Sequence, residues 1–255
     1  MQRHFSMNVK FIILAAGKGK RMNSNIPKAL TRVGDKTILQ YQHEAIVASK
    51  INGNPIVVIG PERQKLCEAF GGECDYAVQE EQLGTGHAVL VAKEAVGDAD
   101  VVVVINGDQP FITTKSLQQL TTRHNERRNT ITMMTTTVPS FTHWYQAFTQ
   151  WGRILRGSNG HIIGIREYKD CTDEEKCIKE LNPSLFCFDT AWLWKNIETL
   201  ETKNAQSEYY LTDLIAIAVG QHQKLSSIDV ASEEVLGINT QEERDIVESV
   251  LKNRF

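Results

Sequence analysis

Residues 11–22 read FIILAAGKGKRM, a run of apolar side chains that passes directly into two glycines and three cations. A short apolar run that ends in glycine predicts the first strand of a parallel sheet. The glycines let the backbone turn sharply after that strand, which brings its N–H groups close to phosphate oxygens. Arg21 and Lys28 add two cations within reach of the same anionic group. The stretch therefore predicts a site for a nucleoside triphosphate.

Two better-known phosphate-binding loops are excluded by single residues. A dinucleotide-binding fingerprint requires a third glycine at position 22, where this chain has Met22. A Walker A loop ends in Gly-Lys-Ser or Gly-Lys-Thr, whereas Gly19 is followed by Lys20 and Arg21. For this loop taken alone, an ordinary strand-to-helix turn with surface lysines stays the alternative interpretation.

The first half of the chain alternates between two patterns. Continuous apolar runs are typical of strands buried on both faces, and apolar residues three and four positions apart are typical of helices. The alternation predicts an α/β fold with a doubly wound, mostly parallel sheet of the Rossmann-like type. Ligands of such sheets bind beyond the carboxyl ends of the strands, where Gly17 and Asp108 both fall. We expect strands at Phe11–Ala16, Ile56–Ile59, Asp75–Val78 and Val101–Ile105, and helices at Ile38–Lys50, Glu62–Phe70 and Gly86–Val96.

The second half has a less regular pattern. The polar segment Asp170–Glu180 is expected to be an exposed loop or the edge of a lid, and the aromatic segment Phe141–Trp151 is interpreted as packing, with a pocket wall or partner surface as the alternative. Because the chain has no repeats and no clear linker, a single domain over 1–255 is the simplest organisation. We expect strands at Thr130–Thr137, Ile162–Ile165 and Leu185–Phe188, and helices at Ala191–Leu200, Leu211–Val219 and after Thr240, which forms a capping-box pattern with Glu243.

Composition limits the classes of partner. The 255 residues carry a net charge of −3, and the densest basic cluster, Arg123–Arg128, is short and contains Glu126, which argues against nucleic-acid binding. No apolar stretch approaches the roughly 20 residues of a membrane-spanning helix. The five cysteines show no CxxC spacing, which argues against a zinc site and a disulfide framework. Since Met1–Met7 also lacks the apolar core of a signal peptide, we expect a cytoplasmic protein.

Polar groups follow two further predicted strands. Asp108 ends a buried strand, where a carboxylate can hold Mg²⁺ between phosphate groups; a turn or helix-capping aspartate is the alternative for this residue alone. Gln79 ends another strand, and its amide can pair with the ring amide of a nucleobase. Gly84 and Gly86 permit close backbone approach, and His87, at the start of a helix, is interpreted as structural.

Several short motifs occur in order along the chain: Leu14–Met22, Pro27-Lys28, Gln79–Ala88, Gly107-Asp108-x-Pro110, Gly152-Arg153-Ile154, Gly164–Glu167, Asn182, Asn204–Asp213 and Gly237-Ile238-Asn239. Together they resemble the motifs of the sugar-1-phosphate nucleotidyltransferase family. The resemblance is to the uridylyltransferase domain of its bifunctional N-acetylglucosamine-1-phosphate uridylyltransferase/glucosamine-1-phosphate acetyltransferases. It extends from about residue 9 to about residue 245. Each motif alone is weak, so the specificity lies in the combination.

The resemblance implies a nucleotide-diphospho-sugar transferase fold and Mg²⁺-dependent transfer of a nucleotidyl group from a nucleoside triphosphate to a sugar 1-phosphate. UTP and N-acetylglucosamine 1-phosphate are the implied pair, with 8–110 as the nucleotide-binding half and 111–255 as the sugar-binding half. The implied residues are Leu14, Ala15, Ala16, Gly17, Gln79, Gly84 and Thr85 for the nucleotide, Arg21, Lys28 and Asp108 for catalysis, Gly152, Glu167 and Asn182 for the sugar, and Asp108 with Asn239 for the metal.

Departures from the family pattern gather on the sugar side. Asn106 stands where the family has tyrosine, and Pro183-Ser184 stands where Thr-Gly or Ser-Gly is usual. GTP, CTP or another sugar phosphate therefore stay as alternatives, as does a protein that binds a nucleotide sugar without turnover. The sequence ends at Phe255, so no acetyltransferase activity is expected, and no oligomeric state is predicted.

Overall fold

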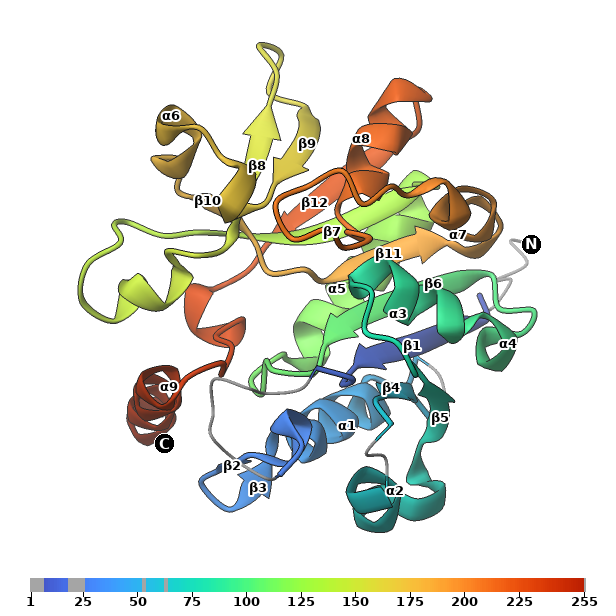
Figure 1. The fold of residues 1–255 in the computed structure, drawn as a ribbon, viewed down its shortest axis with the longest axis vertical. Helices are drawn as coiled ribbons and strands as arrows, with labels where there is room; N and C mark the ends of the chain where they lie inside the picture. The colour runs from blue at the N-terminus through green and yellow to red at the C-terminus, as the bar shows by residue number, and fades with distance from the viewer. Residues whose placement is uncertain (1–6, 18–25, 52–53, 62–63, 255) are drawn as a thin grey trace.

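A computed structural model describes residues 7–17, 26–51, 54–61 and 64–254 (Figure 1). The strands are β1 (Val9–Leu14), β2 (Arg32–Val33), β3 (Lys36–Thr37), β4 (Ile56–Ile59), β5 (Asp75–Val78), β6 (Val101–Asn106), β7 (Ile131–Thr137), β8 (Gly152–Arg156), β9 (Ile162–Arg166), β10 (Glu180–Asn182), β11 (Phe186–Asp189) and β12 (Leu225–Asp229). The described residues form one ten-stranded sheet in the order β5-β4-β1-β6-β11-β7-β10-β8-β9, with β12 paired to β7 beside this path. The short strands β2 and β3 form a separate antiparallel pair.

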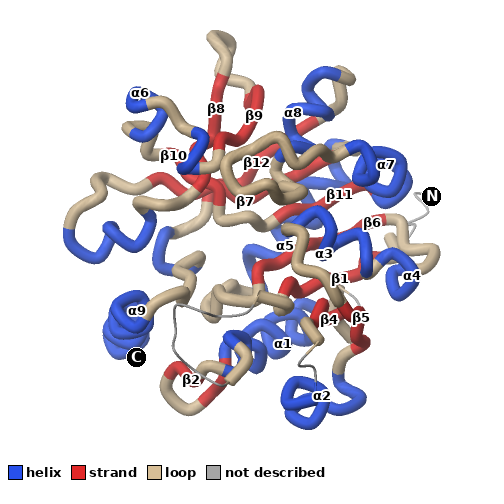
Figure 2. Tube along the Cα trace, viewed as in Figure 1, coloured by secondary structure: helices blue, strands red, loops and turns tan. Residues whose placement is uncertain are grey.

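Helices lie on both sides of the sheet, as Figure 2 shows. Of the helices in the described part of the chain, none has both the length and the apolar character of a bilayer-spanning segment. The α-helices are α1 (Ile38–Ser49), α2 (Gln64–Phe70), α3 (Thr85–Val91), α4 (Lys93–Val96), α5 (Thr114–Arg127), α6 (Asp173–Lys176), α7 (Thr190–Asn196), α8 (Asp213–Gly220) and α9 (Gln241–Arg254). Short 3-10 turns occur at Lys28–Leu30, Gly71–Glu73, His143–Phe148, Tyr168–Asp170, Ile197–Thr199 and Ser232–Glu234.

The strands of the first half form the parallel part of the sheet, which confirms the predicted fold class. β1 lies between β4 and β6 and runs parallel to both, with Leu14 opposite Val58 on one side and Asn106 on the other. β5 extends this part beside β4, also in parallel. Because the strands run in one direction, the carboxyl ends of β1, β5 and β6 meet at one edge of the sheet.

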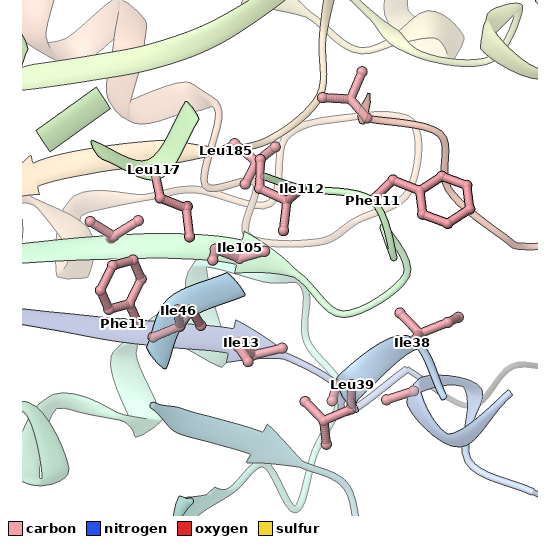
Figure 3. Packing of buried hydrophobic residues seen from close by; sticks show 14 of the residues in the cluster. Phe11, Ile13, Ile38, Leu39, Ile46, Ile105, Phe111, Ile112, Leu117 and Leu185 are labelled. Atoms are coloured by element: carbon pink, nitrogen blue, oxygen red, sulfur yellow. The ribbon is translucent and has the colours of Figure 1, made fainter. Parts of the chain in front are cut away.

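Alternating side chains along β1 divide the core into two layers. Phe11 and Ile13 lie on the side of the sheet that carries α1 and α5, where they pack near Ile46 and Leu117 (Figure 3). Ile12 belongs to the opposite layer, which contains residues of α3, α7 and α8. Since both layers are apolar, a central strand has no solvent-facing side, and its sequence is a continuous apolar run.

Two predicted boundaries differ where the chain leaves the sheet. The first strand covers Val9–Leu14 and not 11–16, because the chain turns away after the Ala15 N–H donates to the carbonyl of Val58 (2.8 Å). The helix predicted over 86–96 consists of α3 and α4, which are separated at Ala92, whose N–H bonds Val89 three residues back (3.1 Å). Glu62, the predicted start of the helix over 62–70, lies outside the described residues.

The sequence pattern does not predict β8, β10 and β12. β10 has three residues, and β12 reads Leu-Ser-Ser-Ile-Asp, so neither shows an apolar run or a clean alternation. Their pairing depends on long-range partners: β12 runs parallel to β7, whereas β11 pairs antiparallel with both β6 and β7. The parallel sheet of the first half therefore continues as a mixed sheet.

The polar segment 170–180 contains a short helix and is not a plain loop. The Thr172 hydroxyl accepts from the Glu175 N–H (3.2 Å), and the Glu175 carboxylate accepts from the Thr172 N–H (2.9 Å), so a capping box starts α6. In the aromatic segment, Trp144 stacks on Tyr145 with ring centroids 4.0 Å apart, and Phe148 is fully buried beneath them. The interpretation of this segment as packing is confirmed.

His124, on α5, gives the fold a defined response to acid. The side chain is 3% exposed, and burial lowers its pKa from the ordinary 6.5 to about 4. As pH falls below 6.5, the unfolded chain takes up a proton that the folded chain does not, so stability present above pH 6.5 is lost on the way to pH 4. We expect this group to remove about 3 kcal/mol of unfolding free energy over that interval.

The measurement is urea unfolding at a series of pH values for the wild type and His124→Gln. The variant should lose less stability between pH 6.5 and 4 than the wild type does. His161→Gln, at an exposed histidine, is the control and should keep the wild-type slope. Equal slopes in all three proteins would contradict the assignment.

Candidate active site

A cavity of about 700 Å³ lies at the carboxyl ends of β1, β5 and β6. The predicted nucleotide-binding residues line this cavity, together with Lys28, Asp108 and Asn239. Arg21 lies outside the described residues. The lining residues are Leu14, Ala15, Ala16, Gly17, Lys28, Ala29, Gln79, Gln82, Gly84, Thr85, Ala88, Asn106, Gly107, Asp108, Glu208 and Asn239.

A smaller cavity of about 130 Å³ adjoins the first and shares Asn106, Asp108 and Asn239 with it. The predicted sugar-binding residues all line this cavity, although they come from three different strands or loops. Its lining residues are Asn106, Asp108, Gln109, Trp151, Gly152, Glu167, Asn182, Pro183, Ser184 and Asn239. Trp151 shows that the aromatic segment also contributes one wall of a pocket.

Lys28, Asp108 and Asn239 meet where the two cavities join. The Lys28 ammonium donates to Asp108 Oδ2 (2.7 Å) and to Asn239 Oδ1 (2.5 Å), although 80 and 211 positions separate the partners along the chain. Lys28 begins a 3-10 turn, Asp108 follows β6 and Asn239 lies just before α9, so tertiary packing brings the three side chains together. The side-chain oxygens of two distant segments thus converge on the Lys28 ammonium.

Local structure holds both oxygen ligands in place. The Gly107 N–H donates to the Leu14 carbonyl (2.9 Å), and a Cβ on Gly107 would lie 2.6 Å from that oxygen, so only glycine lets the Asp108 loop pack against β1. On the other side, Glu243 accepts from the N–H groups of Asn239 (2.5 Å) and Thr240 (3.1 Å). Thr240 Oγ1 in turn accepts from the Glu243 N–H (3.1 Å), which confirms the predicted capping box.

The donor set at this junction fits Mg²⁺. Mg²⁺ prefers oxygen ligands and is typically held by one or two carboxylates, with substrate phosphates and water completing its shell. Asp108 Oδ2 and Asn239 Oδ1 are two such oxygens, and both accept hydrogen bonds from the Lys28 ammonium. Among the described residues no group of three or more His, Cys, Asp or Glu side chains could hold a metal. A metal held by these two oxygens would need further oxygen ligands, such as phosphate groups or water.

Gln79 lies at the end of β5 and is 3% exposed. Its Nε2 donates to the Gly84 carbonyl (3.1 Å) and to His87 Nδ1 (3.1 Å), so both amide hydrogens are engaged within the protein. His87 therefore orients Gln79, in agreement with its interpretation as structural. Gln79 can therefore offer a ligand only its Oε1 acceptor. Its amide cannot pair with a nucleobase through a donor and an acceptor at once, as the sequence suggested.

The close approach that Gly84 permits is made by the protein's own chain. Gly84 has φ of +113°, and a Cβ there would lie 2.7 Å from the Tyr209 carbonyl oxygen. The same oxygen accepts from the Gly86 N–H (2.8 Å), and Thr85 Oγ1 accepts from the Leu211 N–H (3.0 Å). The motif Asn204–Asp213 thus closes over the start of α3 and forms one wall of the larger cavity through Glu208.

Glu167 and Gly152 form a polar wall of the smaller cavity. A Cβ on Gly152 would lie 3.4 Å from both Glu167 carboxylate oxygens, so the two residues are in contact. Glu167 Oε1 accepts from the Thr212 hydroxyl (3.0 Å). Burial raises the pKa of Glu167, and the Thr212 hydrogen bond opposes that shift. A carboxylate with one free face can accept hydrogen bonds from ligand hydroxyls.

Asn182 lines the smaller cavity, but its amide is engaged by its own turn. Asn182 Oδ1 accepts from the Ser184 N–H (2.9 Å), and Nδ2 donates to Ser184 Oγ (3.1 Å). Ser184 has φ of +58°, the left-handed conformation that glycine adopts more readily, and glycine is the usual family residue there. The turn therefore keeps the shape expected with glycine and presents a hydroxyl in addition.

Several lining residues were not assigned by the sequence motifs, notably Gln82, whose Nε2 donates to the Ala16 carbonyl. Gln82 lies inside the motif Gln79–Ala88, so its position was a usable signal. Gln109 is the unassigned position of Gly107-Asp108-x-Pro110, and no pattern in the sequence separates it from a surface residue. Gln109 becomes a lining residue because it is bound to the carbonyl of Pro183, 74 positions away, which only the tertiary structure shows.

Comparison with protein families and curated proteins gives one consistent result. Residues 11–203 match the model of the MobA-like NTP transferase domain. The bifunctional protein GlmU of Thermoanaerobacter pseudethanolicus is 36% identical over 246 residues, which are 96% of this chain and 52% of the relative. GlmU of Clostridioides difficile is 38% identical over 252 residues, 98% of this chain and 53% of the relative. The chain thus spans about half the length of the curated relatives it matches.

Solved structures share the fold. A UDP-glucose pyrophosphorylase complexed with UDP-glucose superposes with a TM-score of 0.78 at 16% identity, covering 98% of this chain and 100% of the other. A CMP:2-keto-3-deoxy-manno-octonic acid synthetase complexed with CTP superposes with a TM-score of 0.70, also at 16% identity, covering 97% and 100%. At this identity the likeness concerns the fold alone.

Proposed function

Because the chain belongs to the family of MobA-like NTP transferase domains, we propose that it transfers a nucleotidyl group from a nucleoside triphosphate to a sugar 1-phosphate. The products are a nucleotide sugar and pyrophosphate. UTP and N-acetylglucosamine 1-phosphate are the proposed pair, in line with the similarity to GlmU over nearly the whole chain. The observation that carries the proposal is the junction of two cavities at Lys28, Asp108 and Asn239.

The proposed chemistry follows from that junction. A phosphate oxygen of the sugar 1-phosphate attacks the α-phosphorus in line, and the bond to pyrophosphate breaks on the opposite side. The attacking oxygen is already ionised, so the step requires no general base and depends on positioning and charge neutralisation. The larger cavity places the nucleotide, the smaller one places the sugar, and the reacting groups meet beside Asp108.

Lys28 is proposed to supply positive charge to the triphosphate, and Arg21 is proposed to assist it. Asp108 and Asn239 are proposed to hold Mg²⁺, which when bound neutralises phosphate charge. The Lys28 ammonium lies against both oxygens, so a metal held by Asp108 and Asn239 would release it to face the phosphates. Both positive groups would then neutralise phosphate charge.

Gln79 supports a preference for uracil. With Nε2 engaged by Gly84 and His87, Gln79 offers Oε1 to a base. The ring N–H of uracil donates to such an acceptor, whereas the corresponding nitrogen of neutral cytosine carries no hydrogen and is itself an acceptor. This supports UTP over CTP; guanine also has a ring N–H, so GTP is tested directly.

The experiment is pyrophosphate release with Mg²⁺, using ATP, CTP, GTP and UTP against N-acetylglucosamine 1-phosphate and glucosamine 1-phosphate. We expect turnover with UTP and the acetylated sugar, and loss of turnover when EDTA removes the metal. Turnover with another pair would keep the reaction and change the substrates. Tight binding of UTP with no pyrophosphate release from any pair would overturn the enzymatic proposal in favour of a nucleotide-sugar-binding protein.

A further inference from the structure

Gln109 lies between the catalytic junction and the smaller cavity. It follows Asp108 directly, lines the smaller cavity and is 2% exposed. Its Nε2 donates to the carbonyl of Pro183 (2.8 Å), in the turn that carries Asn182 and Ser184. The side chain thus joins the loop of Asp108 to the turn that forms the opposite wall of the cavity.

The main chain around Gln109 is held independently of its side chain. Gln42, on α1, donates from Nε2 to the carbonyls of Asn106 (2.7 Å) and Gln109 (3.0 Å), on either side of Asp108. These bonds set the shape of the 106–109 loop. The Gln109 side chain is therefore not required to hold that loop, and its contribution lies on the cavity side.

The other end of the Gln109 amide has no partner. Oε1 is buried, and no hydrogen bond reaches it from the described residues. A buried carbonyl oxygen without a donor is unfavourable, and such groups in native proteins call for an explanation. Gln109 lines the smaller cavity, so a group seated there can supply the missing donor once the side chain adjusts to present Oε1 to it.

We infer that Gln109 is a specificity-determining residue for the acceptor, and that its Oε1 accepts a hydrogen bond from an O–H or N–H group of the sugar. The inference rests on the proposed function and extends it to the unassigned position of the motif Gly107-Asp108-x-Pro110. Gln109 Oε1 and the Glu167 carboxylate give the cavity hydrogen-bond acceptors, whereas Ser184 Oγ, which accepts from Asn182 Nδ2, keeps its O–H as a donor. These acceptors select a sugar that has several donors and reject one that lacks the donor facing Gln109.

The test compares the binding of nucleotide sugars with the binding of UTP, because only the former fill the smaller cavity. Calorimetry in the presence of Mg²⁺ measures dissociation constants for UTP, UDP-N-acetylglucosamine and UDP-glucose. In Gln109→Met the side chain keeps its length but loses the Oε1 acceptor together with the Nε2 donor to the Pro183 carbonyl. We expect the dissociation constant of the preferred nucleotide sugar to rise about tenfold, the effect of one hydrogen bond, while that of UTP changes less than twofold.

Gln42→Met is the matched control. Gln42 is 0% exposed, its Oε1 is likewise buried without a partner among the described residues, and it lines neither cavity. Its loss should disturb the 106–109 loop and change the affinities for UTP and for the nucleotide sugar by similar factors. Gln109→Leu serves as a second variant, and urea unfolding verifies that each protein is folded.

Three outcomes would overturn the inference. They are an unchanged affinity for nucleotide sugars in Gln109→Met, an equal weakening of UTP and nucleotide sugars, and a wild type that binds UTP but neither nucleotide sugar. None of these depends on turnover. Failure of the proposed function would instead appear as the absence of pyrophosphate release by the wild type, so the two results can be separated.

Discussion

Lys28→Ala is expected to lower pyrophosphate release by roughly 10²–10³-fold, the usual effect of removing one group that stabilises charge in the transition state. Its ammonium lies 2.7 Å from Asp108 Oδ2 and 2.5 Å from Asn239 Oδ1, at the junction of the two cavities. Alanine removes the one described lysine or arginine that lines either cavity. Steady-state rates with saturating substrates measure the loss of turnover, and urea unfolding measures any loss of stability.

Lys36→Ala is the matched control for this prediction. Lys36 also forms an ion pair at 2.7 Å, with Glu44, but both side chains are exposed and neither lines a cavity. Exposed pairs of this kind contribute about 1 kcal/mol or less, and turnover should be unchanged. A folded Lys28→Ala protein that retains the wild-type rate would remove Lys28 from the catalytic proposal.

Arg153→Met is expected to destabilise the protein by about 3 kcal/mol, because it leaves buried carbonyl groups without donors. Arg153 is 1% exposed, and burial lowers the pKa of its guanidinium. No carboxylate in the described part of the chain pairs with it. It donates instead to the backbone carbonyls of Trp151, Thr149 (3.0 Å) and Lys176 (3.1 Å).

Two aromatic rings complete the Arg153 environment. The guanidinium lies 4.7 Å from the ring centroid of Phe141 and 5.1 Å from that of Tyr168, distances at which a cation is attracted to the ring face. Arg153 therefore connects the aromatic segment to the segment around α6 behind the sugar-side wall. Loss of this connection should also raise the Michaelis constant for the sugar phosphate, since Gly152 precedes Arg153.

Arg156→Met, three positions further along β8, is the control for Arg153. Arg156 forms a bidentate pair with Glu180 (2.7 and 2.6 Å), but the pair lies at the surface. Its loss should cost about 1 kcal/mol or less by urea unfolding. If Arg153→Met is no less stable than Arg156→Met, the buried guanidinium does not hold these segments together.

The parallel half of the fold is predictable because burial on both faces leaves a strong signal. Val101–Ile105 is apolar at every position, since each side chain of a central strand lies in one of two apolar layers. β12 shows the opposite case. Its side chains are all partly or largely exposed and its sequence is mixed, so only its pairing with β7 makes it a strand.

The residues proposed for the site were predictable by type and by position at strand ends, but their contacts were not. Gln79 was expected to face a base with its whole amide, yet Gly84 and His87 use its donors. Asn182 lines the smaller cavity as the predicted sugar contact would require, and the bonds of its amide to Ser184 were not predicted. In both cases a local turn satisfies a buried polar group, and a motif does not record which partner it takes.

The sequence by itself determined the fold class, the edge of the sheet where the larger cavity lies, and the kinds of groups that gather there. Only the tertiary structure decided that Lys28 meets Asp108 and Asn239, and that Gln109 turns its amide toward Pro183. The physical reason is one of range. Apolar periodicity reports how a segment faces the core, whereas a contact across 80 or 211 positions depends on how distant loops pack at the edge of the sheet.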